Sequence, residues 1–205
     1  MPLPKIKLSV RKGANADIPL RIETGSLSFA AITAMTKGAP MRVTAPAHGV
    51  PDGWYVAIID AKGMTSLNAA DSNDIRDTEF HRVTWIDADT LDFDDISSAN
   101  FKPYTSGGYL AFYAPMDLSA YTSARMDLKI RVGGDVILAL STTAGTLEID
   151  AATSTVWIRL TAADLEAISS RDYVTDIELV HATAVDAICS ADSVMSVLPE
   201  VTTSA

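Results

Sequence analysis

Five aspartates lie between residues 87 and 95, and carboxylates at this density can bind a hard cation. They are Asp87, Asp89, Asp92, Asp94 and Asp95. Calcium prefers several oxygen ligands, but the glycine and the glutamate that a helix–loop–helix calcium site requires are missing here. Aspartates also favour turns, because the carboxylate bonds to its own backbone. We therefore interpret the run as a turn between two strands, with a calcium site as the alternative.

The histidines and the single cysteine argue against a metal centre. His48, His81 and His181 lie far apart, and no His-x-His or His-x-x-x-His spacing occurs. We expect His48 to lie in a turn and to bond local backbone, with a metal ligand as the alternative. Cys189 has apolar neighbours, so we expect a buried, inert thiol. No cofactor and no metal are expected.

No motif for nucleophilic catalysis or phosphate binding occurs in the sequence. The Gly-x-Ser-x-Gly pentapeptide is missing, and Gly107-Gly108 and Gly133-Gly134 are typical of turns. The spacing of paired carboxylates is set by the fold, so a hydrolase that trims a cell-surface polymer stays open as an alternative. We expect that the chain is not an enzyme.

Aromatic side chains are the best candidates for contacts with other molecules, and they concentrate in and just after residues 32–108. Most of them are expected to fill a core; the alternative is an exposed platform for a carbohydrate or a neighbouring subunit. Trp157 alternates with the apolar residues on either side of it, so it leaves the main apolar face. It either lies under the second sheet or anchors an interface. The candidate interface residues are Trp54, Tyr55, Tyr104 and Trp157.

The composition limits the class of protein to which these residues can belong. The chain has 205 residues, 48% of them hydrophobic and 20% charged, which is normal for a globular protein of one or two domains. Its net charge of -10 argues against binding a nucleic-acid backbone. No apolar run approaches the length of a membrane span, and the N-terminus lacks the apolar core of a signal peptide. Neither nucleic acid nor a membrane is expected as a partner.

The hydrophobic periodicity is that of strands. Residues Lys5–Arg11 and Asp17–Glu23 alternate polar and apolar side chains, and the turn residues Gly13–Ala16 lie between them. This pattern predicts a hairpin. Pro19 cannot donate to a ladder, so we expect the second strand to lie at a sheet edge or to carry a bulge.

Later segments repeat the pattern and are interrupted by one short helix. Thr161 and Asp164 form a variant of the capping box, and Leu165 and Ile168 supply a short apolar stripe. Further strands are expected at residues 124–131, 136–140, 146–150, 156–160, 173–181 and 193–198. The predicted class is all-β: an antiparallel β-sandwich with one short helix and an inserted small β-barrel-like module.

The module between residues 32 and 108 is expected from a resemblance. Its elements are Ala47-His48-Gly49, Gly53-Trp54-Tyr55-Val56, Gly63-Met64-Thr65-Ser66-Leu67-Asn68, Asp87-Ala88-Asp89-Thr90-Leu91-Asp92-Phe93 and Tyr104-Thr105-Ser106-Gly107-Gly108. Their order and spacing resemble a small β module named after the half-domain of ubiquitin-activating enzymes in which it was first defined. That module is scattered widely through tail proteins of tailed bacteriophages. The resemblance implies a virion part and offers no catalytic motif to carry over.

The segments outside this module carry a second resemblance. They are Asp117–Thr122, Met126–Arg131, Ile137–Thr142, Trp157–Asp164, Tyr173–Leu179 and Val194–Thr202. Their series looks like a phage structural domain similar to the N-terminal domain of upper baseplate proteins. The expected layout is one β domain formed by residues 1–31 and 109–205, with residues 32–108 inserted at a loop, where insertions are tolerated.

Together the two resemblances imply a structural component of a tailed-phage virion, in the tail, baseplate or tail-fibre attachment region. Such a protein acts through protein–protein contacts with other phage structural proteins, and we expect a homo-oligomer in the particle. It would be made in the host bacterial cytoplasm and located in the virion. The alternatives are a carbohydrate-binding module for host recognition, with a glycan as partner, and a head-to-tail joining (neck) protein.

Overall fold

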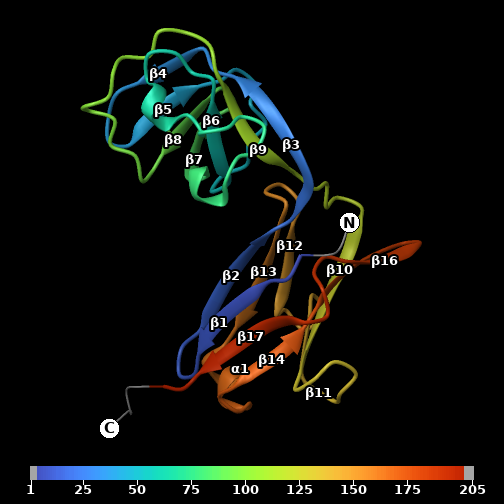
Figure 1. Cartoon of the computed structure of the whole chain (residues 1–205). Coiled ribbons are helices and arrows are strands. Elements are labelled where there is room, and N and C mark those ends of the chain that lie inside the picture. Colours follow the sequence, from blue (N-terminus) through green and yellow to red (C-terminus); the bar gives the residue numbers. More distant parts are fainter. Residues whose placement is uncertain (1–3, 201–205) are drawn as a thin grey trace. The chain divides into compact units, whose positions relative to one another are not determined.

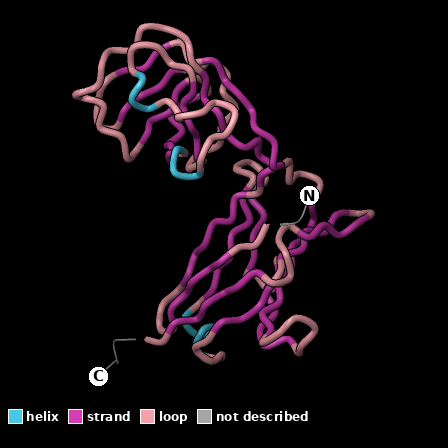
Figure 2. The backbone as a smooth tube through the Cα atoms, viewed as in Figure 1, coloured by secondary structure: helices cyan, strands magenta, loops and turns pink. Residues whose placement is uncertain are grey.

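The computed structural model describes residues 4–200, which divide into two units by the contacts within each. The first unit holds the chain up to Ile22 and again from Asp117 onward; the second holds Glu23–Met116. Strands dominate both units (Figures 1 and 2). The all-β class expected from the sequence is confirmed.

Two sheets form the first unit. Its strands are β1 (Lys7–Arg11), β2 (Ala16–Arg21), β10 (Tyr121–Lys129), β11 (Val136–Ser141), β12 (Leu147–Asp150), β13 (Thr155–Leu160), β14 (Asp172–Thr175), β15 (Ile177–His181), β16 (Ala184–Ala187) and β17 (Ser193–Leu198). The larger sheet has the order β1-β17-β14-β10-β15-β16, with β11 also paired to β10, and the smaller has the order β12-β13-β2. Alternate side chains of both sheets are buried, among them Met126 and Leu128 on β10 and Val156 and Ile158 on β13. These side chains form the core of a sandwich. Burial of each large apolar side chain stabilises the folded unit by about 1.5–3 kcal/mol.

The hairpin predicted at the start of the chain does not form. β1 pairs in parallel with β17, whereas β2 pairs antiparallel with β13 in the other sheet. Alternation of side chains fixes which face of a strand is buried but leaves its partner open, so the two runs can lie in different sheets. β2 is an edge strand, as Pro19 predicted.

A single strand was also expected over residues 173–181, but the chain forms two. β14 pairs with β17, whereas β15 pairs with β10, and Asp176 lies between them. β16, which pairs with β15, was not predicted, because its four residues are too short for a periodic signal.

The predicted helix is α1 (Ala162–Glu166), and its capping box is present. The Asp164 amide donates to Thr161 Oγ1 at 3.2 Å, and the Thr161 amide donates to Asp164 Oδ2 at 2.8 Å. Leu165 and Ile168 are buried, which confirms the apolar stripe. Across residues 4–200, no helix has the length and apolar character needed to cross a membrane.

The second unit is one curled sheet. Its strands are β3 (Glu23–Ala31), β4 (Ala34–Thr36), β5 (Met41–Thr44), β6 (Tyr55–Ile59), β7 (His81–Asp87), β8 (Thr90–Phe93) and β9 (Tyr109–Pro115), with short 3-10 turns η1 (Thr65–Leu67) and η2 (Asp77–Glu79). Their order is β3-β9-β6-β7-β8-β5-β4. The first and last strands of this order, β3 and β4, are consecutive in the chain and are linked by Ile32 and Thr33. The Ile32 amide bonds to Gly108 O at 3.0 Å and the Thr33 amide to Thr44 O at 2.9 Å, so the sheet closes on itself like a barrel.

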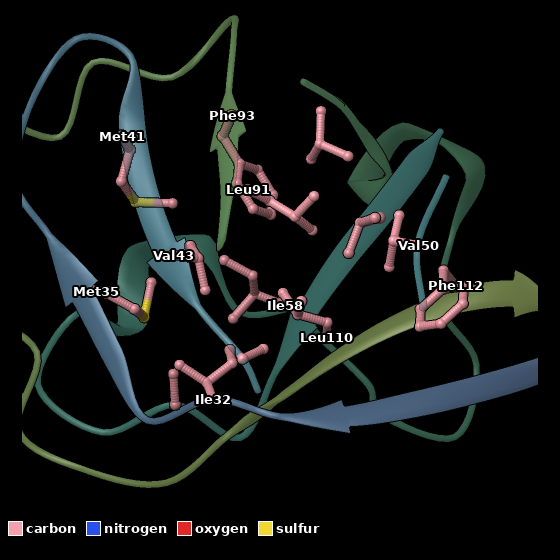
Figure 3. Packing of buried hydrophobic residues seen from close by; sticks show 14 of the residues in the cluster. Ile32, Met35, Met41, Val43, Val50, Ile58, Leu91, Phe93, Leu110 and Phe112 are labelled. Carbon is pink, nitrogen blue, oxygen red and sulfur yellow. The ribbon is translucent and has the colours of Figure 1, made fainter. Parts of the chain in front are cut away.

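A single apolar core fills this curled sheet (Figure 3). Met41 on β5, Phe93 on β8 and Leu110 on β9 are fully buried, and Ile58 on β6 packs among them. The core thus draws on strands from the whole length of the unit, which therefore has the buried interior that a small domain requires.

The boundary between the units lies further out than the sequence placed it. Residues 23–31 and 109–116 belong with the inserted unit and not with the flanking one. The reason is that β3 and β9 pair with each other from Glu23–Pro115 to Ala31–Tyr109, within the sheet of the inserted unit. The inserted unit is therefore Glu23–Met116 in place of residues 32–108.

Candidate functional site

Three neighbouring strands of the second unit, β3, β9 and β6, present a common face opposite the apolar core. Cross-strand partners share a face, and the register joins Phe29 to Ala111 and Ala111 to Ala57. The next row joins Ala31 to Tyr109 and Tyr109 to Ile59. The alternate residues Leu110, Phe112, Val56 and Ile58 point into the core.

Large apolar side chains on this face are open to solvent. We define the aromatic face as Leu27, Phe29, Tyr55 and Tyr109, whose exposed fractions are 36%, 54%, 45% and 45%. Between them lie Ala57 and Ala111, which are buried. Single exposed apolar residues are ordinary on a protein surface, but a group that follows adjacent strands marks an interaction site.

Part of the same face is covered from within the unit. The ring of Phe80 stacks on that of Tyr113, with centroids 5.6 Å apart, and Tyr113 lies opposite Leu27 on β9. Tyr113 is accordingly less exposed than Tyr109. The open part of the aromatic face therefore extends from Tyr109 to the outer strand β3.

The backbone of β3 is open along one side. Ile32 and Gly108 continue the β3–β9 register, and the Ile32 amide bonds to Gly108 O. Since hydrogen-bonded positions recur every second residue, Ser28 and Ala30 direct their backbone groups toward β9. The backbone groups of Leu27, Phe29 and Ala31 point the opposite way, off the edge of the sheet.

This edge lacks the usual protection against pairing. From Thr24 to Ala31 the strand contains neither a charged residue nor a proline. Edge strands of the first unit are different: β1 carries Lys7 and Arg11, and β2 carries Pro19. Charges and prolines on an edge discourage the addition of another strand. The β3 edge is therefore suited to pair with a strand from outside the unit.

Two of the predicted interface residues, Trp54 and Tyr55, are neighbours in sequence but direct their side chains to opposite faces of the sheet. Trp54 is fully buried, and its Nε1 donates to Tyr113 O at 2.9 Å, so its assignment to an interface was wrong. Tyr55 begins β6, points to the opposite side and belongs to the aromatic face. The prediction of a contact residue at Tyr55 remains a prediction.

Tyr104 serves the interior of its own unit. Its hydroxyl lies 3.0 Å from the carbonyl oxygens of both Ile32 and Gly107 and shares its one proton between them. Burial raises the pKa of this phenol. Tyr104 therefore holds together the corner at which the sheet closes, and it is not part of the aromatic face.

Trp157 lies on the side of β13 opposite the buried residues of that strand, as its alternation predicted. It is partly covered by Arg159, whose guanidinium carbon lies 5.0 Å from the ring centre. Arg159 also bonds to Glu148 at 2.7 Å and to Asp17 at 3.1 Å, and these contacts raise its pKa. The three strands of the small sheet are thus tied together on this face, which accounts for Trp157 without a partner molecule.

The acidic run is held by bonds within the unit. Asp87 accepts from the Asp89 amide at 2.9 Å, and Asp89 accepts from the Ala47 amide at 2.8 Å, which confirms the turn interpretation. Asp92 forms a two-pronged bond to Arg42 at 2.7 and 2.8 Å. Among the residues that the structure describes, no group of three or more His, Cys, Asp or Glu side chains is arranged to hold a metal. The calcium alternative therefore receives no support.

The contacts of His48 and the burial of Cys189 also indicate structural roles. His48 is 4% exposed; its Nδ1 accepts from the Val50 amide and its Nε2 lies against Asp87 O, each at 3.0 Å. The expectation of a turn histidine bonded to local backbone is confirmed. Cys189 is buried, and burial raises the pKa of its thiol, which disfavours the reactive thiolate.

Carboxylates converge at one hollow in the first unit, as the hydrolase alternative requires. This hollow of about 300 Å³ is lined by Asp127, Asp176 and Glu178. Two of these carboxylates are bound to cations: Glu178 to Arg125, and Asp127 to Lys129 at 3.3 Å. These ion pairs give Glu178 and Asp127 structural partners within the first unit and account for them without a catalytic role.

Sequence reasoning missed Leu27, Phe29 and Tyr109, which dominate the open part of the aromatic face. In Ser26-Leu27-Ser28-Phe29-Ala30 the apolar residues alternate with serine, a pattern that predicts burial of Leu27 and Phe29. The structure places Ala30 against the core and leaves Phe29 half exposed. The alternation is visible in the sequence, but it indicates the wrong face of the strand.

Comparison of the chain with protein-family models finds no match, and comparison with curated proteins finds none.

Proposed function

We propose that this chain is a structural component of a tailed-phage virion, in the tail, baseplate or tail-fibre attachment region, and that it acts through protein–protein contacts. The observation that carries the proposal is the aromatic face with its adjoining open edge on β3. Its large apolar side chains are 36–54% exposed and follow adjacent strands, and exposed apolar groups of this kind mark interaction sites. The resemblance of both units to phage modules supplies the context.

The chemistry of the aromatic face favours a protein partner over a glycan. Sugar recognition combines an aromatic platform with polar groups placed beside it. Here the neighbours of Phe29 and Tyr109 are Ala57, Ala111 and Ile59, and the one charged neighbour, the exposed Arg82, lies opposite Tyr55, away from β3. An apolar patch beside free backbone donors and acceptors instead fits an extended polypeptide, which supplies both side chains and strand hydrogen bonds. The outer face of β3 and β9 therefore acts as a binding surface for a neighbouring subunit.

Incorporation of variants into particles tests this proposal. Particles are assembled with the wild-type chain or with Phe29→Lys or Tyr109→Ser, and the copies per particle are counted by quantitative mass spectrometry. Trp85→Lys is the matched control, because Trp85 is 46% exposed but lies on β7. We expect Phe29→Lys and Tyr109→Ser to lower the copy number by about tenfold or more, as loss of a central aromatic contact does, and the control to leave it unchanged.

Two results would count against the proposal. Absence of the wild-type chain from purified particles would remove the virion assignment altogether. Equal incorporation of all three variants would remove the aromatic face from assembly. In that case binding of a soluble host-surface oligosaccharide, followed through the NMR signals of Tyr55 and Tyr109, becomes the decisive measurement for the carbohydrate-binding alternative.

A further inference from the structure

We infer that the first unit binds a neutral saccharide in a hollow beside Tyr121, at the free edge of β12. The hollow is separate from the aromatic face, and the inference does not depend on the proposed function. It adds a ligand of another chemical class, because the hollow combines an aromatic ring with polar groups placed beside it, as sugar recognition requires.

The hollow is lined by the start of β10 and by β12, and its volume is about 370 Å³. The polar part of its lining comes from Ser119, Tyr121, Thr122, Thr142 and Glu148, and leucine, isoleucine and alanine residues supply the rest. Pockets for small molecules have volumes of about 300–1,000 Å³ and combine apolar walls with a few polar groups. The hollow therefore has the size and the lining of a small-molecule site.

The ring of Tyr121 is held in one orientation from within the unit. Its hydroxyl donates to Asp186 Oδ2 at 2.8 Å. The imidazole of His181 meets the ring edge-on, with centroids 5.4 Å apart and planes at 87°. A ring that is already fixed loses little freedom when a ligand stacks on it, so Tyr121 can serve as the aromatic platform.

Hydroxyl groups beside this ring offer both kinds of hydrogen bond. Thr122 Oγ1 donates to Val180 O at 3.3 Å, which leaves its lone pairs to accept from a ligand. Thr142 Oγ1 accepts from the Ala124 amide at 3.3 Å, and its own proton remains to be donated. Because a hydroxyl both donates and accepts, the hydroxyls of a sugar can satisfy both threonines.

The free edge of β12 adds backbone groups to the hollow. β12 is the outermost strand of the smaller sheet, and the Arg159 amide of β13 bonds to Thr146 O at 2.9 Å. Since hydrogen-bonded positions recur every second residue, Leu147 and Ile149 direct their N–H and C=O groups to the free side of β12. Both residues line the hollow, which thus gains backbone donors and acceptors.

Charge selects the class of ligand. Among the described residues that line the hollow, Glu148 alone is charged, and its carboxylate accepts from Arg159 at 2.7 Å. In a chain of net charge -10, a lining without Lys or Arg disfavours phosphates and other anions. The donors at Thr142 and on the β12 backbone disfavour an ammonium group, which can only donate. A neutral ligand with many hydroxyls fits all of these groups.

The same edge is guarded against another polypeptide strand. β12 alternates its apolar residues with Glu148 and Asp150, and charges on an edge discourage the addition of a strand. Asp150 is also held in the turn after β12, where it accepts from the Thr153 hydroxyl at 2.6 Å. The hollow therefore suits a compact ligand better than an extended peptide.

Titration of the full-length chain with defined trisaccharides tests the inference. The neutral probes are maltotriose and the N-acetylglucosamine trimer; the glucosamine trimer is the cationic probe and trigalacturonic acid the anionic one. NMR follows the amides of Leu147 and Ile149 and the ring of Tyr121. We expect saturable shifts of these signals with at least one neutral probe, at a dissociation constant of about 1 mM or tighter, and none with the anionic probe.

Two variants test the site itself, and the dispersion of their NMR signals checks their folding. Tyr121→Leu removes the aromatic platform and should weaken binding by about tenfold or more. Thr142→Val keeps the shape of the side chain and removes one hydroxyl, so it should weaken binding about three- to tenfold. Thr143→Val is the matched control, because Thr143 is exposed and does not line the hollow, and it should leave binding unchanged.

Several results would overturn the inference. Neither neutral probe may leave the signals of Leu147, Ile149 and Tyr121 unchanged in common: if both do so, the site does not bind a neutral saccharide. Shifts confined to Tyr55 and Tyr109 would move glycan binding to the aromatic face. Tighter binding of the glucosamine trimer than of either neutral probe would assign the hollow to a cationic ligand.

The outcome is independent of the proposed function. A chain that binds a neutral trisaccharide beside Tyr121 but is absent from particles keeps the inference and removes the virion proposal. A chain that is present in particles but binds neither neutral probe removes the inference and keeps the virion proposal. Binding that both Tyr121→Leu and Thr142→Val leave intact would also overturn the inference, because it would place the ligand elsewhere.

Discussion

At the scale of single residues, buried polar side chains hold the loops of the second unit in place. His48 follows Ala47, whose backbone has a positive φ of 52°, and its imidazole bonds to the Val50 amide in the same turn and to the Asp87 carbonyl at the end of β7. A buried ring with both nitrogens satisfied stabilises such a bend, because an unpaired polar group in that position would be costly.

Replacement of His48 by alanine should therefore destabilise the second unit. The Val50 amide would lose its acceptor in a buried site, and such a loss costs about 2 kcal/mol. Urea denaturation followed through NMR signals of the second unit measures the change. His81→Ala is the control, since His81 pairs with the exposed Asp95, and it should cost less than about 1 kcal/mol. Equal losses in the two variants would contradict the role assigned to His48.

Asp164 provides a pH-dependent contribution to the first unit. Hydrogen bonds from the Thr161 hydroxyl and amide lower the pKa of this carboxyl below its ordinary value of 3.8. Because the folded-state pKa is the lower one, the stabilisation is present above the unfolded-state value and is lost as pH falls through the folded-state value. Wild type should exceed Asp164→Asn in stability by about 0.5–1 kcal/mol at neutral pH.

This difference should shrink toward zero as the pH is lowered below 3.8. Denaturation of both proteins at a series of pH values gives the difference directly. A difference that stays constant from neutral pH into the acid range would show that the ionised capping box does not contribute.

Residue identity alone left the direction of several side chains undetermined. Trp54 and Tyr55 are adjacent and were both expected at an interface, yet Trp54 is buried and Tyr55 is 45% exposed. Successive residues of a strand point to opposite faces, so only one of such a pair can face a partner. Which one does so depends on the neighbouring strands, and a single chain's sequence does not reveal them. The bond between His48 and the Val50 amide was predictable because these two residues are close in sequence.

At the scale of elements, close backbone approach fixes the corner where β9 begins. Gly108 has φ +90°, and a Cβ at this position would lie 2.7 Å from Ala61 Cα. Both the conformation and the space thus require glycine. The same corner supplies the carbonyl of Gly108 to Ile32, which sets the backbone direction of β3.

Gly108→Ala should destabilise the second unit by about 2–4 kcal/mol, because strain and a backbone clash add. Gly49→Ala is the matched control: Gly49 has φ +67° but nothing within 4 Å of its Cβ position. The control should cost about 1 kcal/mol. Thermal or urea unfolding measures both, and a cost for Gly108→Ala no larger than that of the control would refute the close-approach argument.

The elements themselves were largely predictable, and their partners were not. Alternation and capping located β10, β13 and α1, because these signals depend on residues close in sequence. The pairing of β1 with β17 joins residues at opposite ends of the chain, and alternation contains no information on it. The face that β3 exposes was likewise hidden, since its apolar residues Leu27 and Phe29 point away from the core.

At the scale of the whole molecule, the inserted unit has the features of an independent domain. It has its own core, and both ends of the insertion are paired, with Glu23 opposite Pro115. A segment whose ends lie together and whose core is internal can be excised with little loss. Residues 23–116 alone should therefore fold, with dispersed NMR signals and a cooperative urea transition. Collapsed or unfolded signals from this fragment would show that the flanking strands are required.

We propose that the aromatic face and the β3 edge form a contact surface in a virion. A density map of the assembled particle, in which this chain is located and its copies are counted, tests this proposal. We expect repeated copies around the tail region, with Phe29 and Tyr109 buried against a neighbouring subunit and a strand added to β3. A particle in which β3 and its aromatic side chains face solvent, or one that lacks the chain, would contradict it.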